Sequence, residues 1–147
     1  MTERKRCLLM TVESDSHIWN LVYLQLFLEE RGYQVDNLGC CTKVAYALRR
    51  IAETSPAFVL VSSVNGHGYV QGMRLYAEAE SRFGSEIPEF VIGGKLTTHL
   101  SDIPRIKRNL LDIGYTAVFV DGDMIAELDS FLLARNSSLD ELKFMIG

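Results

Sequence analysis

The chain lacks the features that mark several large classes of protein. None of its 147 residues fall in an apolar stretch approaching the roughly 20 residues that a membrane-spanning helix needs. The apolar run Cys7–Val12 behind the basic cluster Arg4-Lys5-Arg6 is too short for a signal-peptide core. Positive charge is not in excess, since the net charge is −4, and nucleic-acid binding needs a cationic face. We therefore expect neither a membrane nor a nucleic acid as a partner.

Cysteine is scarce, and its spacing matches neither a disulfide framework nor a metal-binding pair. The three cysteines are Cys7, Cys40 and Cys41, and no two of them form a Cys-x-x-Cys motif. We expect reduced thiols in a cytoplasmic protein, because disulfides persist mainly in oxidising compartments. A redox role for the adjacent Cys40 and Cys41 is the alternative interpretation.

What the chain does have is a regular alternation of apolar runs with amphipathic segments. Hydrophobic residues make up 48% and charged residues 23%, as in soluble globular proteins. The runs predict five strands, at Cys7–Val12, Tyr33–Leu38, Ala57–Val61, Glu89–Ile92 and Ala117–Val120. The segments between and after them predict helices at Ile18–Arg31, 43–54, Tyr69–Phe83, from a cap at Ser101 to Ile113, around Ile125–Leu132, and a short terminal helix opened by a capping box at Ser138 and Glu141.

This alternation predicts an α/β fold with a doubly wound, five-stranded parallel sheet. Right-handed crossovers favour the flavodoxin-like strand order 2-1-3-4-5, with the polar run Tyr33–Leu38 at a sheet edge. No linker, repeat or low-complexity segment interrupts the pattern, so we expect one domain over residues 1–147.

Polar residues and glycines gather where the expected strands end. Asp15 and His17 follow the first strand, and Gly93-Gly94-Lys95 follows the fourth. The third strand is followed by Ser62, Ser63 and Asn65-Gly66-His67-Gly68. Ligands bind beyond the carboxyl ends of such strands, near the switch between the first and third. A carboxylate two residues before a histidine can hold one ring nitrogen and make the other a better metal ligand. We therefore predict His17 as a metal ligand.

Three common occupants of this fold do not match the chain. Glu13 and Asp15 would repel a flavin phosphate from the first turn, which also lacks a Gly-x-Gly-x-x-Gly fingerprint for dinucleotides. A phospho-accepting receiver domain needs an aspartate at the end of the third strand, where Ser62-Ser63 stands.

A zinc site made of three histidines, His17, His67 and His99, is an open alternative. Gly93-Gly94 serves either unusual backbone angles or the close approach of a ligand.

Three segments carry a resemblance to a known family, the small cobalamin-binding subunit of glutamate mutase (methylaspartate mutase). Its motif is Asp-x-His-x-x-Gly, then Ser-x-Leu, then Gly-Gly. The matching segments here are Asp15-Ser16-His17-Ile18-Trp19-Asn20, Ser62-Ser63-Val64 and Gly93-Gly94. The likeness extends from the first strand to about Gly122, and it departs from the motif at Asn20 and Val64.

The resemblance implies a cofactor, a reaction and a partner. His17 would be the lower cobalt ligand in place of the cofactor's own dimethylbenzimidazole, and Asp15 would hold its imidazole. The displaced nucleotide tail would enter a slot between sheet and helix, where Ser62 would bond its base and Gly93-Gly94 would make room. Adenosylcobalamin would lie between this chain and a larger barrel-type subunit, and its radical would interconvert L-glutamate and 3-methylaspartate. The implied cofactor-binding residues are Ser14, Asp15, Ser16, His17, Ile18, Ser62, Ser63, Val64, Gly93, Gly94, Lys95, Leu96, Thr97, Thr98 and His99.

The two departures keep a second hypothesis open. A side chain at Asn20 projects close to where the tail should enter, although asparagine tolerates unusual backbone angles. A cobalamin-responsive regulatory or interaction module, or a paralogue that has lost the cofactor, is therefore the alternative to a mutase subunit.

Overall fold

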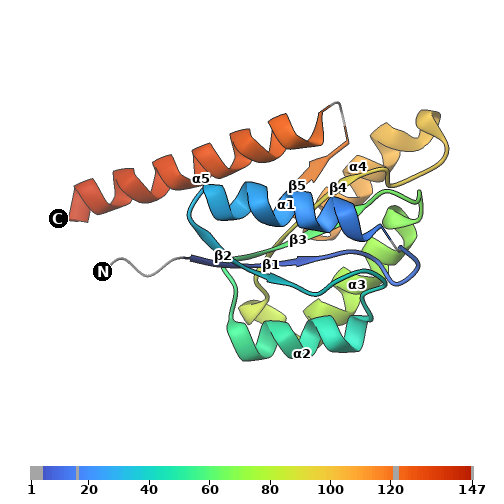
Figure 1. Cartoon of the computed structure of the whole chain (residues 1–147), viewed down its shortest axis with the longest axis horizontal. Coiled ribbons are helices and arrows are strands. Elements are labelled where there is room, and N and C mark those ends of the chain that lie inside the picture. The colour runs from blue at the N-terminus through green and yellow to red at the C-terminus, as the bar shows by residue number, and fades with distance from the viewer. Residues whose placement is uncertain (1–4, 16, 121–122, 147) are drawn as a thin grey trace.

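The fold is a parallel sheet covered by helices, as Figure 1 shows. The computed structural model describes residues 5–15, 17–120 and 123–146, without the side chains of residues 18, 19 and 137–146. Its sheet has the order β2-β1-β3-β4-β5, and every neighbouring pair is parallel, which confirms the predicted fold class. The elements are β1 (Lys5–Met10), α1 (Ile18–Glu30), β2 (Tyr33–Asn37), α2 (Val44–Thr54), β3 (Phe58–Ser63), α3 (Gly68–Phe83), η1 (Gly84–Glu86), β4 (Glu89–Gly94), η2 (Leu100–Asp102), α4 (Ile103–Ile113), β5 (Ala117–Phe119) and α5 (Met124–Ile146).

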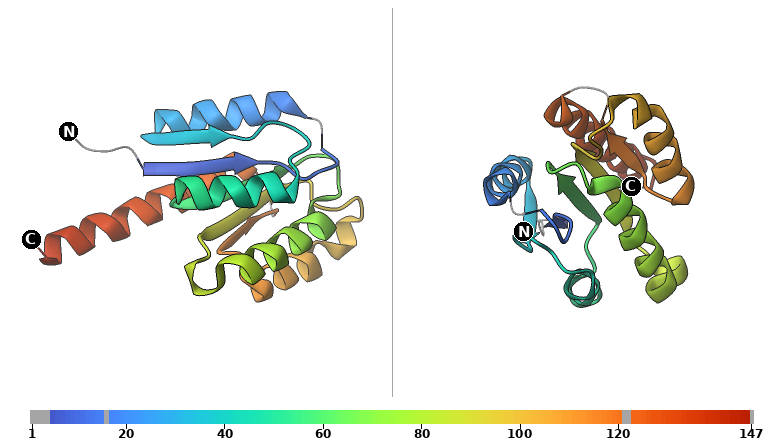
Figure 2. Two further views of the ribbon diagram at one scale, coloured as in Figure 1. Left: turned by 90° about the horizontal axis from the view of Figure 1, so that it is seen from below. Right: turned by 90° about the vertical axis from the view of Figure 1, so that its right-hand side faces the viewer.

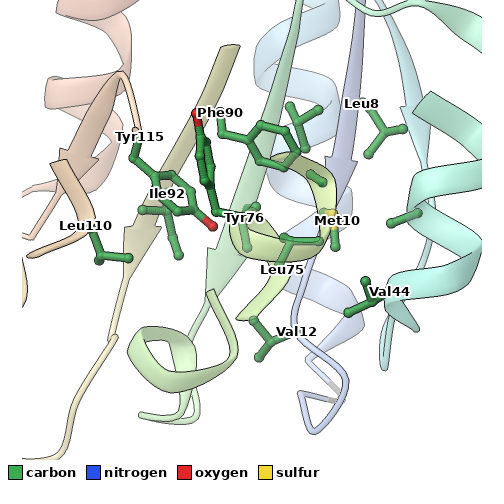
Figure 3. Packing of buried hydrophobic residues seen from close by; sticks show 14 of the residues in the cluster. Leu8, Met10, Val12, Val44, Leu75, Tyr76, Phe90, Ile92, Leu110 and Tyr115 are labelled. Carbon is green, nitrogen blue, oxygen red and sulfur yellow. The ribbon is translucent and has the colours of Figure 1, made fainter. Parts of the chain in front are cut away.

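Two apolar clusters hold the helices against opposite faces of the sheet. Phe58 and Leu60 of β3 pack in the cluster that includes residues of α1 and α5. Val59 and Val61 belong to the other cluster, with residues of α2, α3 and α4, part of which is drawn in Figure 3. Successive strand side chains point to opposite faces, so one continuous apolar strand serves both layers. Figure 2 shows the resulting arrangement from two further directions.

Two polar pairs belong to strands, contrary to the prediction that the strands end before them. β3 continues through Ser62 and Ser63, and β4 continues through Gly93 and Gly94. The parallel register pairs Ser62 with Gly93 and Ser63 with Gly94. Backbone pairing does not require apolar side chains, so the ladder runs past the end of the apolar pattern. This extension places all four residues at the carboxyl edge in fixed positions.

Most other predicted boundaries agree with the structure to within one residue, and three elements differ by more. β1 starts at Lys5 rather than Cys7, because Lys5 and Arg6 pair with the start of β2. It ends at Met10 rather than Val12. Ser101 lies inside η2, and Asp102 is the residue before α4, with no side-chain cap bond. Ser138 lies within α5, which is one helix rather than two. The segment 123–146 contains neither glycine nor proline, so nothing in it stops the helix. Within the described part of the chain, no helix has both the length and the apolar character needed to cross a membrane.

The buried thiol of Cys7 makes the fold sensitive to alkaline pH. Burial raises the pKa of Cys7 from 9.0 to about 12. Between these values the unfolded chain loses the proton and the folded chain keeps it, so the free energy of unfolding falls by up to about 1.4 kcal/mol per pH unit. Urea unfolding of the wild type and of Cys7→Ala, at about pH 8 and about pH 10, measures this loss. We expect a smaller loss in Cys7→Ala, and an equal loss in both proteins would contradict the prediction.

Candidate functional site

The site lies at the carboxyl edge of the sheet, at the switch between β1 and β3. From β1 the chain crosses to β2 on one side, and from β3 it crosses to β4 on the other. The two loops that leave β1 and β3 therefore diverge and leave room between them. The right-hand view of Figure 2 shows the molecule from this edge.

A buried carboxylate orients an exposed imidazole at this switch point. The Nδ1 atom of His17 lies 2.7 Å from Oδ1 of Asp15, which also accepts a bond from the His17 backbone N–H at 3.1 Å. The Asp15 side chain is 1% exposed, whereas that of His17 is 57% exposed. An ionised carboxylate only accepts hydrogen bonds, so Nδ1 is the donor, and in the neutral imidazole the lone pair is then on Nε2. This is the protonation state that a metal-ligating histidine requires.

Asp15 is itself held by bonds from two other segments. Its Oδ2 accepts the backbone N–H of Val64 at 2.8 Å, and its carbonyl accepts the N–H of Cys41 at 2.7 Å. Burial raises the pKa of Asp15, but the bonds from Val64 and His17 outweigh burial and leave the pKa below its ordinary value. The carboxylate is therefore ionised near neutral pH and positioned from several directions.

A second group of hydrogen bonds joins the loop after β1 to the loop after β3 and to the first turn of α3. The Ser14 hydroxyl donates to Oε1 of Gln71 at 3.2 Å and accepts from Nδ2 of Asn65 at 3.0 Å. The same hydroxyl lies 3.3 Å from Nδ1 of His67. The sequence placed Asn65 at this edge, after the third strand. It gave no indication of Gln71, whose role depends on the first turn of α3 lying beside the loop after β1.

The three-histidine zinc interpretation is wrong. His17, His67 and His99 are all within the described residues, and among those residues no three His, Cys, Asp or Glu side chains form a group that could hold a metal ion. His17 pairs with Asp15, and His67 contacts Ser14. His17 is therefore available only as a single protein ligand.

Next to the histidine lies a strip of sheet surface between α1 and α5, which we call the Ser62–Gly93 strip. Ser62 is 1% exposed and lies beside Gly93 in the ladder. Two side chains cover the strip. Asn20 of α1 donates from Nδ2 to the Ser62 hydroxyl at 2.5 Å, and a Cβ added at Gly93 would lie 3.0 Å from the terminal methyl of Met124. The sequence identified Asn20 as a departure from a motif, and it gave no signal for Met124.

The backbone conformation at Gly94 requires a glycine, for reasons that do not apply to Gly93. Its φ is +102°, and an added Cβ would lie 2.2 Å from the carbonyl oxygen of Ser63. Both observations require glycine. The bend lets the N–H of Lys95 reach the same Ser63 carbonyl at 2.6 Å. The backbone-angle interpretation therefore holds for Gly94. An added Cβ at Gly93 would instead meet the Cβ of Phe119 on β5 at 2.9 Å and the movable end of the Met124 side chain at 3.0 Å.

The segment after β4 lines a cavity on the same edge. The cavity has a volume of about 430 Å³ and is lined by Gly94–Thr98 together with residues of η2 and α4 and Val120, which follows β5. His99 is exposed, and its backbone N–H bonds the Thr97 hydroxyl at 3.1 Å. Of the other implied site residues, Ser16 and the side chain of Ile18 are outside the described parts of the chain. The remaining implied residues all lie at the carboxyl ends of β1, β3 and β4 or in the loops that follow them.

Fold and site together define a flavodoxin-like domain that presents a carboxylate-oriented histidine at its switch point. The family model described as B12 binding domain matches residues 5–123. The glutamate mutase sigma subunit of Halobacterium salinarum is 30% identical over 109 residues, 74% of this chain and 72% of that subunit. The corresponding subunit of Carboxydothermus hydrogenoformans is 28% identical over 116 residues, 79% of this chain and 84% of that subunit. The chain belongs to the B12-binding domain family, in the branch of the glutamate mutase sigma subunits.

A solved structure supports the fold independently. The crystal structure of a cobalamin-binding protein from Desulfitobacterium hafniense superposes with a TM-score of 0.65 at 18% identity, over 88% of this chain and 60% of that protein. This chain thus spans less than two thirds of that protein, and the likeness at this identity concerns the fold alone. The predicted resemblance to the small subunit of glutamate mutase is confirmed by the family match and the two sigma subunits.

Proposed function

We propose that the chain is the cobalamin-binding small subunit of an adenosylcobalamin-dependent carbon-skeleton mutase of the glutamate mutase type. The observation that carries the proposal is the Asp15–His17 pair, in which a 1% exposed carboxylate holds Nδ1 of a half-exposed imidazole at 2.7 Å. Imidazole nitrogen is a good ligand for cobalt, and an outer carboxylate fixes its tautomer and raises its basicity.

The residues present fit the lower face of a corrinoid. His17 would hold the cobalt through Nε2, and Asp15 would keep the proton on Nδ1. The Ser62 hydroxyl would offer a hydrogen bond to the base of the displaced tail, and Gly93 would let the tail lie against the backbone. Asn20 and Met124 cover that strip with the ends of flexible side chains, which would have to move to admit the tail, whereas the Cβ of Phe119 beside Gly93 is fixed on β5.

The other implied residues would surround the corrin ring. Ser14 and Val64 flank the Asp15–His17 pair, and Lys95–His99 follow β4 beside the cavity at the same edge. Bound adenosylcobalamin supplies the radical for a carbon-skeleton rearrangement such as that of L-glutamate to 3-methylaspartate. The work of this chain is to bind the cofactor base-off, orient it, and help to exclude water once a partner covers the edge.

The proposed partner is a larger catalytic subunit, which the term sigma subunit in the relatives implies, of the barrel type that the family resemblance implies. The carboxyl edge is the surface that such a partner must cover, because the upper face of the cofactor would project from it. We place the complex in the cytoplasm, where the thiols of Cys7, Cys40 and Cys41 would stay reduced.

Cobalamin binding and reconstitution test the proposal. Purified protein mixed with hydroxocobalamin should show a base-off, histidine-on absorption spectrum. Protein combined with a glutamate mutase catalytic subunit and adenosylcobalamin should then convert L-glutamate to 3-methylaspartate. A protein that leaves the free cobalamin spectrum unchanged would contradict the proposal.

The Asn20–Ser62 bond favours one second candidate, a non-catalytic module that has lost the cofactor or only senses it. Reconstitution separates the two functions. Bound cofactor in a stable complex without turnover would indicate the non-catalytic module, whereas turnover would exclude it.

A further inference from the structure

Asn20 links the first turn of α1 to the end of β3. Its Nδ2 donates to the Ser62 hydroxyl at 2.5 Å, across a separation of 42 residues. Asn20 is half-buried and Ser62 is 1% exposed. Breaking a buried hydrogen bond costs free energy unless both of its groups find new partners or water. The contact therefore has to be broken before any group reaches the Ser62 hydroxyl from the α1 side.

The position of Asn20 relative to His17 makes this contact relevant to a ligand. His17 is the residue before α1, and Asn20, three positions later in the first turn, places its amide on the Ser62 hydroxyl. A molecule held by the His17 imidazole and extending along the sheet toward Ser62 would thus meet the Asn20 amide. The Ser62–Gly93 strip lies directly beneath that amide.

Met124 covers the other side of the strip in a different way. A Cβ added at Gly93 would lie only 3.0 Å from the terminal methyl of Met124. An unbranched thioether changes rotamer readily and breaks no hydrogen bond when it moves. Of these two side chains, Asn20 is the one that is bonded to the strip, so it opposes entry more strongly.

We propose that Asn20 is a gate for the nucleotide tail of a cobamide, whose amide must leave Ser62 before the tail can occupy the Ser62–Gly93 strip. The inference rests on the proposed function, because it assumes a corrinoid held at His17. A corrinoid without a tail has no need of the strip and is insensitive to the gate. Asn20 thereby lowers the affinity for complete cobamides relative to tail-less ones.

A comparison of hydroxocobalamin with cobinamide, which lacks the nucleotide tail, tests the gate. Asn20→Ala removes the amide and keeps a strong helix former. We expect it to bind hydroxocobalamin about fivefold more tightly than the wild type, the factor that corresponds to one hydrogen bond of about 1 kcal/mol. The affinity for cobinamide should not change. Spectroscopic titration measures both dissociation constants. Asn20→Ser, with a shorter side chain, should also lower the dissociation constant for hydroxocobalamin and leave that for cobinamide unchanged.

The chain offers a matched control on the opposite face of the sheet. Asn109 of α4 donates from Nδ2 to the Tyr69 hydroxyl at 3.0 Å, which is the same kind of bond. Asn109→Ala should leave the ratio of the two affinities at the wild-type value. An unchanged ratio in Asn20→Ala, or weaker hydroxocobalamin binding alone, would overturn the gate while His17 ligation stands. Failure of all the proteins to bind either corrinoid would overturn the proposed function and the gate with it.

Discussion

Replacing His17 with glycine is expected to abolish the base-off, histidine-on spectrum of the protein mixed with hydroxocobalamin. Among the described residues, His17 is the histidine that a carboxylate orients, because Asp15 holds its Nδ1 at 2.7 Å and leaves the lone pair of the neutral ring on Nε2. Its loss should weaken binding by more than the roughly 10- to 100-fold that loss of an outer-shell partner produces. Absorption spectroscopy and titration measure both effects, and circular dichroism checks that the fold is retained.

Two further measurements separate ligation from a general effect. Added imidazole is expected to restore a nitrogen-ligated spectrum in His17→Gly, since the space left by the side chain can admit it. His67→Ala removes another histidine from the same edge and should leave the spectrum in place. A His17→Gly protein with the wild-type spectrum would show that a different group, or none, holds the cobalt.

Asp15→Asn is expected to keep the fold and to lower the affinity for hydroxocobalamin roughly 10- to 100-fold, or about 1.4–2.7 kcal/mol. The amide can still accept the Val64 N–H that Asp15 accepts at 2.8 Å. It lacks the charge, and its NH₂ group can donate to Nδ1, which would move the imidazole proton to Nε2. Nitrogen NMR of the His17 ring reports the tautomer, and spectroscopic titration reports the affinity.

The matched control for this variant is Asp36→Asn. Asp36 also has a paired carboxylate, which accepts from Arg50 at 2.9 Å, but it lies on β2 away from the switch point. This variant should bind hydroxocobalamin as the wild type does. An Asp15→Asn protein with wild-type affinity and the proton still on Nδ1 would mean that the carboxylate does not orient the ligand.

The order of elements was predictable because burial leaves a periodic trace along the chain. Helix α2 illustrates this, since Val44, Ala47, Leu48 and Ile51 recur at helical spacing and are its buried residues. Strand β3 is apolar at successive positions because both of its faces are covered. Strict alternation of such segments leaves few topologies, and the predicted order 2-1-3-4-5 is the one observed.

The boundaries were harder to predict because they depend on contacts that periodicity does not record. Ser62 and Gly93 continue their strands because each has a neighbouring strand to pair with. Ser138 has the residue type of a helix cap, yet α5 passes through it without interruption. Local preference for a cap or a loop is weak, and a continuing ladder or helix overrides it.

Sequence alone was enough to find the Asp15–His17 pair, because two residues that are two positions apart at a strand end meet by local geometry. The contacts of Asn20 with Ser62 and of Met124 with the Gly93 backbone arise only when α1 and α5 pack on the same face of the sheet. Such contacts join residues that are distant along the chain, and the rotamers at the interface are selected by packing rather than by neighbouring residues. The prediction of a metal-ligating histidine thus came from a short local motif, whereas access to the Ser62–Gly93 strip depends on how α1 and α5 pack on the sheet.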